Sequence, residues 1–264
     1  MNKDFVIKGH ICYSQDKSTL KVYKNSYLVC VNGKSKGIFE NLPSEYKDLP
    51  LKDYGDKLII PGMVDLHVHA PQYAFRGMCM DLELMDWLNQ YTFPEEEKYT
   101  NLDYAKKAYS IFTKALKNSA TTRACIFATR HRDATVLLME LMEETGLVSY
   151  VGKVNMDREA SEALIEESAE ASAYNTFGWI NSVNNKFQNT KPILTPRFIP
   201  CCTDELMEEL KQIQMTYGIP VQSHLSESPG EIEFVHFLRP NNEFYGDAYN
   251  DYDLFGKMMT STQM

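Results

Sequence analysis

The chain has 264 residues, a hydrophobic fraction of 44% and a formal net charge of −9, so it is long enough for one large domain or two modest ones. Its acidic balance argues against a nucleic-acid or anionic-membrane surface, because both favour an excess of Lys and Arg. No apolar run resembles a signal peptide or approaches the roughly 18 residues of a membrane span, and we interpret the six cysteines as reduced thiols of a cytoplasmic protein.

Residues 1–60 are typical of a small β-module. The segments 4–14, 26–39 and 56–62 are rich in Val, Ile and Tyr and are interrupted by Gly and Asn-Gly, a pattern that indicates strands joined by tight turns.

From residue 61 onward, strand-like segments alternate with helical patterns. Apolar strands are expected near 59–68, 121–129, 146–155, 192–199 and 219–226, and helices over 102–119, 133–145, 159–183 and 203–218. This alternation predicts a parallel sheet, either doubly wound or closed into a (β/α) barrel. We therefore divide the chain into domains 1–60 and 61–264.

Two histidines stand at the end of the first of these strands, in the stretch "PGMVDLHVH". His67 and His69 are two residues apart, and this spacing directs both side chains to the same face of a strand. Such a pair can chelate one divalent cation, with Asp65 nearby to orient an imidazole. The alternative is a pair of solvated or core histidines.

A second group follows the strand near 219–226, in "VQSHLSE". His224 offers a third imidazole, and Glu227 a carboxylate for proton transfer, which together suit metal-assisted hydrolysis. A single histidine after a strand is more often structural. The functional interpretation depends on both groups lying at the C-terminal ends of strands, where barrel enzymes keep their active sites.

Two polar residues near these groups are candidate ligand-binding residues. Arg197 in "LTPRF" presents a planar fork of donors to a carbonyl or ring acceptor, although a surface ion pair is the more common role of such an arginine. Gln72, which follows the histidine pair, can donate and accept at once, although it could simply be a loop amide. No phosphate-binding loop, Cys-x-x-Cys pair or nucleophile elbow is present in the sequence, which disfavours the chemistry of those motifs.

The same stretches resemble a known family. "PGMVDLHVH" is similar to the first-strand motif of the amidohydrolase superfamily of metal-dependent (β/α)-barrel hydrolases. The segments 70–96, 115–129, 192–198 and 221–228 resemble the guanine deaminases of that superfamily, and the similarity extends from about residue 55 to about residue 256. The N-terminal β-module also fits, since these enzymes carry a small β-sandwich beside the barrel.

The resemblance implies specific roles. Zinc is expected to be held by His67, His69 and His224, together with a later histidine and a late aspartate. Glu227 would shuttle the proton, and Gln72 and Arg197 would hold the purine. The implied reaction is hydrolysis of guanine at C2 to xanthine and ammonia, by an enzyme that is a homodimer when full length.

The sequence departs from the family pattern in two places. "NSATTR" at 118–123 replaces the usual "NGTTT", and no histidine follows His236. The segment 61–264 is also shorter than the roughly 250 residues of a complete barrel. We therefore predict an incomplete TIM-like (β/α) barrel of about five of eight units, with an N-terminal portion of a β-sandwich, that is inactive as it stands. The alternatives are a related aminohydrolase acting on another purine, pterin or triazine, and a non-catalytic half-barrel that serves binding or assembly.

Overall fold

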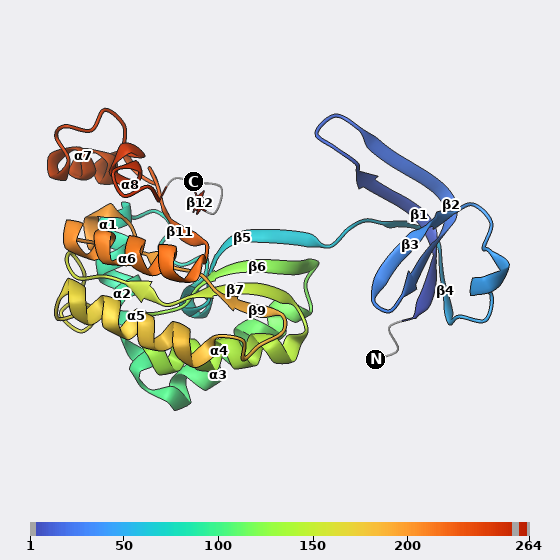
Figure 1. Cartoon of the computed structure of the whole chain (residues 1–264), viewed down its shortest axis with the longest axis horizontal. Coiled ribbons are helices and arrows are strands. Elements are labelled where there is room, and N and C mark those ends of the chain that lie inside the picture. Colours follow the sequence, from blue (N-terminus) through green and yellow to red (C-terminus); the bar gives the residue numbers. More distant parts are fainter. Residues whose placement is uncertain (1–3, 255–258, 263–264) are drawn as a thin grey trace. The chain divides into compact units, whose positions relative to one another are not determined.

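The computed structural model describes residues 4–254 and 259–262, and the chain divides into two compact units, residues 1–62 and 63–264. Figure 1 draws the first unit in blue and the second in cyan to red. No helix in the described ranges is long and apolar enough to cross a membrane.

The first unit contains a four-stranded sheet with the order β3-β2-β1-β4. Its elements are β1 (Phe5–Ser14), β2 (Leu20–Val31), β3 (Lys34–Phe39), the 3₁₀ helix η1 (Ser44–Tyr46) and β4 (Leu51–Ile59). The antiparallel β2–β3 hairpin turns at Asn32 and Gly33, with φ of 54° and 71°, the left-handed conformation that these two residues tolerate well. The described part of this unit forms one sheet, so the predicted β-sandwich stays a prediction.

The second unit is built on parallel strands. Its main sheet has the order β5-β6-β7-β9, and β8 pairs with β10 and β11 with β12, all in parallel. The bounds are β5 (Met63–His69), β6 (Thr121–Phe127), β7 (Val148–Gly152), β8 (Val154–Asn155), β9 (Thr190–Pro192), β10 (Thr195–Pro196), β11 (Val221–His224) and β12 (Met259–Thr262). The predicted α/β class with a parallel sheet is confirmed, and β12 adds a parallel strand after the five predicted ones.

Helices connect the successive strands. The longer ones are α3 (Leu102–Lys117), α4 (Arg132–Thr145), α5 (Ala169–Val183), α6 (Asp204–Tyr217) and α7 (Pro229–Leu238). Neighbours in the chain pack together, α3 on α4, α4 on α5 and α5 on α6 (Figure 1). Short elements complete the unit: η2 (Pro71–Phe75), α1 (Leu84–Trp87), the π-helical turn η3 (Leu88–Thr92), α2 (Phe93–Glu97), η4 (Lys98–Thr100), η5 (Ile199–Cys201) and α8 (Asp247–Asn250).

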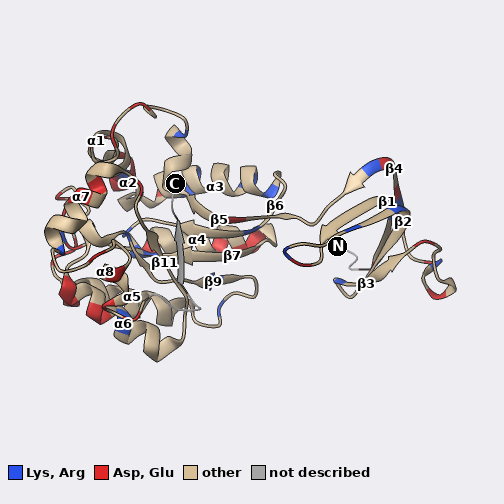
Figure 2. Cartoon of the chain, turned by 90° about the horizontal axis from the view of Figure 1, so that it is seen from above, with Lys and Arg blue, Asp and Glu red and all other residues tan. Residues whose placement is uncertain are grey.

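Helix α6 illustrates why these segments are helical. Its buried residues, Leu206, Met207, Leu210 and Ile213, recur at helical spacing, while its acidic residues, coloured red in Figure 2, are exposed. The side chain of Thr203 accepts the backbone N–H of Leu206 at 3.2 Å, and Gly218 ends the helix at a φ of 61°. These are the cap residues that an amphipathic helix uses to satisfy its terminal backbone groups.

The C-terminal part of strand β6, residues 124–127, is buried on both faces, as a central parallel strand should be. Ala124 and Ile126 pack in the large core beneath the helices, whereas Phe127 belongs to a smaller apolar cluster on the other side. This smaller cluster contains Leu88, Phe93, Phe127, Val154, Met156, Leu164, Phe198 and Cys201. It forms the apolar surroundings of the candidate site.

Three predicted elements differ from those observed. The expected helix over 159–183 begins only at Ala169, because Glu166 turns inward to bond the ammonium group of Lys153 at 2.7 Å and Ser168 caps the helix. The expected strand 146–155 is divided at Lys153 into β7 and β8, and 192–199 is likewise divided into β9 and β10. The helix starts late because the buried ion pair between Lys153 and Glu166 outweighs the helical spacing of the apolar residues before Ala169.

Candidate active site

The His-x-His pair lies where it was expected, at the C-terminal end of β5. His69 is buried and His67 half-buried, and both rings pack against Phe127, with centroids 4.4 and 5.0 Å away, respectively. Asp65 accepts the backbone N–H of His67 at 3.1 Å. It therefore contacts the main chain, and the suggestion that it orients an imidazole ring finds no support in this contact.

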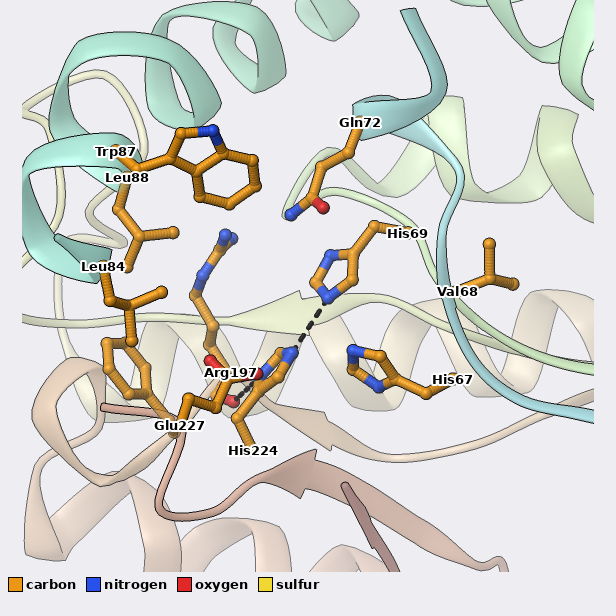
Figure 3. Close-up of a pocket in the computed structure, with 11 residues that line it drawn as sticks. His67, Val68, His69, Gln72, Leu84, Trp87, Leu88, Arg197, His224 and Glu227 are labelled. Carbon is orange, nitrogen blue, oxygen red and sulfur yellow. Dashed lines mark hydrogen bonds between the residues drawn. The ribbon is translucent and has the colours of Figure 1, made fainter. Parts of the chain in front are cut away.

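His224, at the end of β11, completes a triad. Its Nε2 lies 2.8 Å from Nε2 of His69, and the possible ligand atoms of His67, His69 and His224 all lie within 4.8 Å of one another. Figure 3 shows the three rings converging on one region. The predicted ligand histidines, distant in sequence, are thus brought together.

The hydrogen bonding and burial of the triad fit a bound metal ion. His224 donates Nδ1–H to the carbonyl oxygen of Arg197 at 2.6 Å, an arrangement that leaves Nε2 with a lone pair and orients the ring. The Nδ1 atoms of His67 and His69 are buried without a hydrogen-bond partner in the described part of the chain. Burial lowers the pKa of all three imidazoles, well below the ordinary value for His69 and His224. The neutral imidazole is the form that binds zinc and similar ions.

Glu227 lies three residues after His224 and lines the same cavity. The chain turns at Ser226, whose φ is 57°, and Oε1 of Glu227 is buried without a partner among the described residues. Burial, and next the charge of Glu231, raise the pKa of Glu227 to about 7, while Arg197 opposes the increase. Such a carboxyl can both accept and donate a proton near neutral pH.

Arg197 follows β10 and is almost completely buried, with 2% of its surface exposed. Its Nη1 donates to both carboxylate oxygens of Glu96, at 3.0 and 2.8 Å, and its guanidinium lies over the ring of Phe93 at 5.0 Å from the centroid. Neither Nε nor Nη2 has a hydrogen-bond partner among the residues that the structure describes. The ion pair considered for Arg197 therefore exists, but it occupies one nitrogen of the fork only.

A cavity of about 200 Å³ brings all six predicted site residues together. It is lined by His67, Val68, His69, Gln72, Leu84, Trp87, Leu88, Arg197, Phe198, His224 and Glu227 (Figure 3). Gln72 comes from η2, and its side-chain amide extends among these residues.

The sequence reasoning missed part of the lining. Leu84, Trp87 and Leu88 come from α1 and the start of η3, and the indole of Trp87 donates to the carbonyl oxygen of Met78 at 3.3 Å. Glu96, the partner of Arg197, was also missed. The helical spacing of the apolar residues at 84, 87 and 88 was a usable signal, but no local pattern pairs Glu96 with a residue 101 positions away.

Comparison with known proteins agrees with this geometry. Residues 58–261 match the Amidohydrolase family. The chain is 40% identical over 214 residues to guanine deaminase of Rattus norvegicus, covering 80% of this chain and 46% of that protein. It is 34% identical over 273 residues to guanine deaminase of Dictyostelium discoideum, covering 96% and 60%, respectively. This chain thus spans about half the length of the curated relatives it matches.

A solved structure is similar over nearly the whole chain. The crystal structure of guanine deaminase from C. acetobutylicum with guanine bound in its active site superposes with a TM-score of 0.93 at 42% identity, covering 98% of this chain and 62% of that one. The resemblance detected in the sequence motifs is therefore confirmed. Together with the family match over residues 58–261, it establishes that the chain belongs to the amidohydrolase family.

Proposed function

We propose that the protein catalyses the zinc-dependent hydrolytic deamination of guanine to xanthine and ammonia. The observation that carries this proposal is the convergence, in one cavity, of three neutral histidines, a carboxyl with a pKa of about 7 and a buried guanidinium. The similarity to a guanine deaminase with guanine bound in its active site supports guanine as the substrate.

We further propose that residues 61–264 form part of a TIM-like (β/α) barrel of about five of eight units, and that residues 1–60 form the N-terminal portion of a β-sandwich. The succession of parallel strands with intervening helices and the position of the histidines at strand ends support a barrel.

His67, His69 and His224 would hold the metal ion. When bound, zinc supplies a Lewis acid that makes water a stronger acid and nucleophile near neutral pH. These residues fit a metal ion because their imidazoles are neutral and because the Nδ1–H of His224 donates to a backbone carbonyl, which leaves its Nε2 to bind the ion.

Glu227 would move the proton. As a carboxylate it takes a proton from the water whose oxygen forms the new bond to C2, and it delivers that proton to a ring nitrogen. It then carries the remaining proton of that oxygen to the exocyclic amine, so that the bond between C2 and the amine nitrogen breaks and ammonia leaves as the C2 carbonyl forms. A pKa of about 7 suits both directions of transfer.

Arg197 and Gln72 would orient the purine. The Nη1–Glu96 pair holds the guanidinium plane still, which leaves Nε and Nη2 to donate to ring or carbonyl acceptors. The amide of Gln72 can donate to and accept from a heterocycle edge. Both roles explain why such polar groups lie among apolar walls contributed by Leu84, Trp87 and Leu88.

The experiment is to incubate the chain, supplied with zinc, with guanine, adenine and pterins, and to measure the ammonia released and the affinity for each base. We expect guanine to bind most tightly and any ammonia to accompany xanthine. Ammonia from a pterin but not from guanine would reject the guanine assignment in favour of a related aminohydrolase. A stable fold that binds neither zinc nor any of these bases would favour the non-catalytic alternative.

The variant Glu227→Gln tests the role of the carboxyl. In a full-length form it should retain zinc and guanine binding but lose most turnover, because an amide cannot shuttle protons. Near-normal turnover would show that another group carries the proton.

Three expectations remain predictions from the sequence. They are the inactivity of this chain by itself, its homodimeric state in a full-length form and its cytoplasmic location.

A further inference from the structure

Glu231 is a buried carboxylate behind the loop that carries Glu227. It lies in the first turn of α7, with 0% of its surface exposed. Its Oε2 accepts the backbone N–H of Glu227 at 2.6 Å and that of Ser228 at 3.4 Å. Ser228 Oγ in turn accepts the N–H of Glu231 at 3.2 Å. A helix cap explains the Ser228 bonds, but the shortest bond extends one residue further, to Glu227 itself.

Tyr245 holds the other oxygen of this carboxylate. Its O–H donates to Oε1 of Glu231 at 2.6 Å, and its ring lies parallel to that of Tyr249, with centroids 6.0 Å apart. The O–H of Tyr249 donates to the carbonyl oxygen of His224 at 2.6 Å. Residues around α8, which lies beside α7 in Figure 1, thus support the loop from 224 to 227 at both ends.

The partners of Glu231 are N–H and O–H donors, and no Lys or Arg forms an ion pair with it within the described ranges. Its charge is therefore available to act on Glu227, where burial and that charge together raise the pKa. Arg197 acts in the opposite direction. The other titratable groups on this side are Glu83, which accepts from Ser228 Oγ at 2.9 Å, and the imidazoles of the triad, which burial keeps neutral.

We propose that Glu231, anchored by Tyr245, is a positioning residue for the Glu227 carboxyl group. The backbone between His224 and Glu227 passes through the left-handed conformation at Ser226, with a φ of 57°, which is unfavourable for a residue with a side chain. A fixed, charged acceptor for the next N–H stabilises that turn and so determines where the Glu227 side chain begins. The proposal rests on the proposed role of Glu227 in proton transfer.

The test uses the metal-free full chain and two variants. Glu231→Gln preserves size but removes the charge, and Tyr245→Phe removes the anchoring hydroxyl. Glu233→Gln, at an exposed position of the same helix, is the matched control. The first readout is the NMR resonance of the Glu227 amide proton and its exchange rate with solvent. The second is the pH titration of the Glu227 carboxyl carbon in protein labelled at glutamate. The signal that disappears in Glu227→Gln identifies the Glu227 resonance.

In Glu231→Gln we expect the Glu227 amide resonance to move upfield and its exchange to accelerate, since a neutral acceptor bonds more weakly. The pKa of Glu227 should fall from about 7 toward its ordinary value of 4.5. Tyr245→Phe should accelerate exchange of the same amide, and Glu233→Gln should change neither readout. If Glu231→Gln folds and leaves the Glu227 amide resonance, its exchange rate and the carboxyl titration unchanged, the proposal is wrong. If Glu231→Gln does not fold, unchanged exchange of the Glu227 amide in Tyr245→Phe would overturn the proposal.

Turnover separates this inference from the proposed function. In a full-length form supplied with guanine, Glu231→Gln should lower kcat by about tenfold, a fraction of what general acid–base catalysis supplies, and change KM less. A shifted Glu227 titration in this chain, together with a full-length form that does not turn over guanine, would support the positioning role and count against the proposed reaction only.

Discussion

Replacing Glu227 by Gln should stabilise the folded chain above neutral pH. A carboxyl whose pKa is about 7 in the folded chain and 4.5 in the unfolded chain costs the charged fold about 3.5 kcal/mol at most, because each pH unit between the two values is worth about 1.4 kcal/mol. Because Glu227 is only partly buried, solvent screening reduces that figure, and we expect about 1–3 kcal/mol.

The sign of the effect follows from protonation. Below pH 4.5 the carboxyl is neutral in both states, so parent and variant should be equally stable in this respect. Between pH 4.5 and about 7 the folded chain retains the proton longer than the unfolded chain does. The advantage of Glu227→Gln should therefore appear as the pH rises through this window and level off above it.

The assay is urea unfolding of parent and variant at pH 5, 6, 7 and 8 in the presence of a chelator. Metal removal matters because a bound cation would itself favour the charged carboxylate. The exposed Glu233→Gln removes the same formal charge from the neighbouring helix and should show no such pH-dependent gain. If Glu227→Gln has the same effect at pH 5 and pH 8, the raised pKa and the argument from burial are wrong.

Three further predictions concern the metal, the guanidinium and the core. In a full-length form, Arg197→Lys should raise KM for guanine roughly tenfold or more without changing zinc content, because a point charge replaces a planar fork that Glu96 holds. Metal loss with unaltered guanine affinity would make Arg197 structural. His224→Ala should reduce the zinc bound per chain in metal analysis and remove the stabilisation by zinc, about 2.7 kcal/mol at 100 times its Kd; a variant that zinc stabilises like the parent argues against His224 as a ligand. Lys153→Met should cost about 3–5 kcal/mol in urea unfolding because it leaves the buried Glu166 unpaired. Adding Glu166→Gln should recover part of that loss, whereas a cost below about 1 kcal/mol for the single variant contradicts the assigned pairing.

Much of the candidate site could be predicted because it follows from local patterns. Two histidines at alternate positions of a strand must share a face, and in parallel α/β folds the strand ends meet at one edge of the sheet. These two rules place His67, His69 and His224 together without knowledge of any contact. The helices 102–119, 133–145 and 203–218 were predicted to within about two residues of the observed bounds, because their apolar spacing and caps are encoded within each segment.

The remaining features depend on partners far apart in the chain. Lys153 divides a predicted strand and Glu166 delays a predicted helix because the two side chains pair in the core at 2.7 Å, and neither segment alone reveals the other. The same applies to Glu96, which secures Arg197 from 101 positions away, and to Tyr245, which reaches Glu231 from beyond the end of α7. By itself, the sequence predicted which residues gather at the candidate site, since their spacing reflects backbone geometry. Only the tertiary structure decided which groups hold them in place, because a buried charge or hydrogen bond is satisfied by whichever partner the fold brings near.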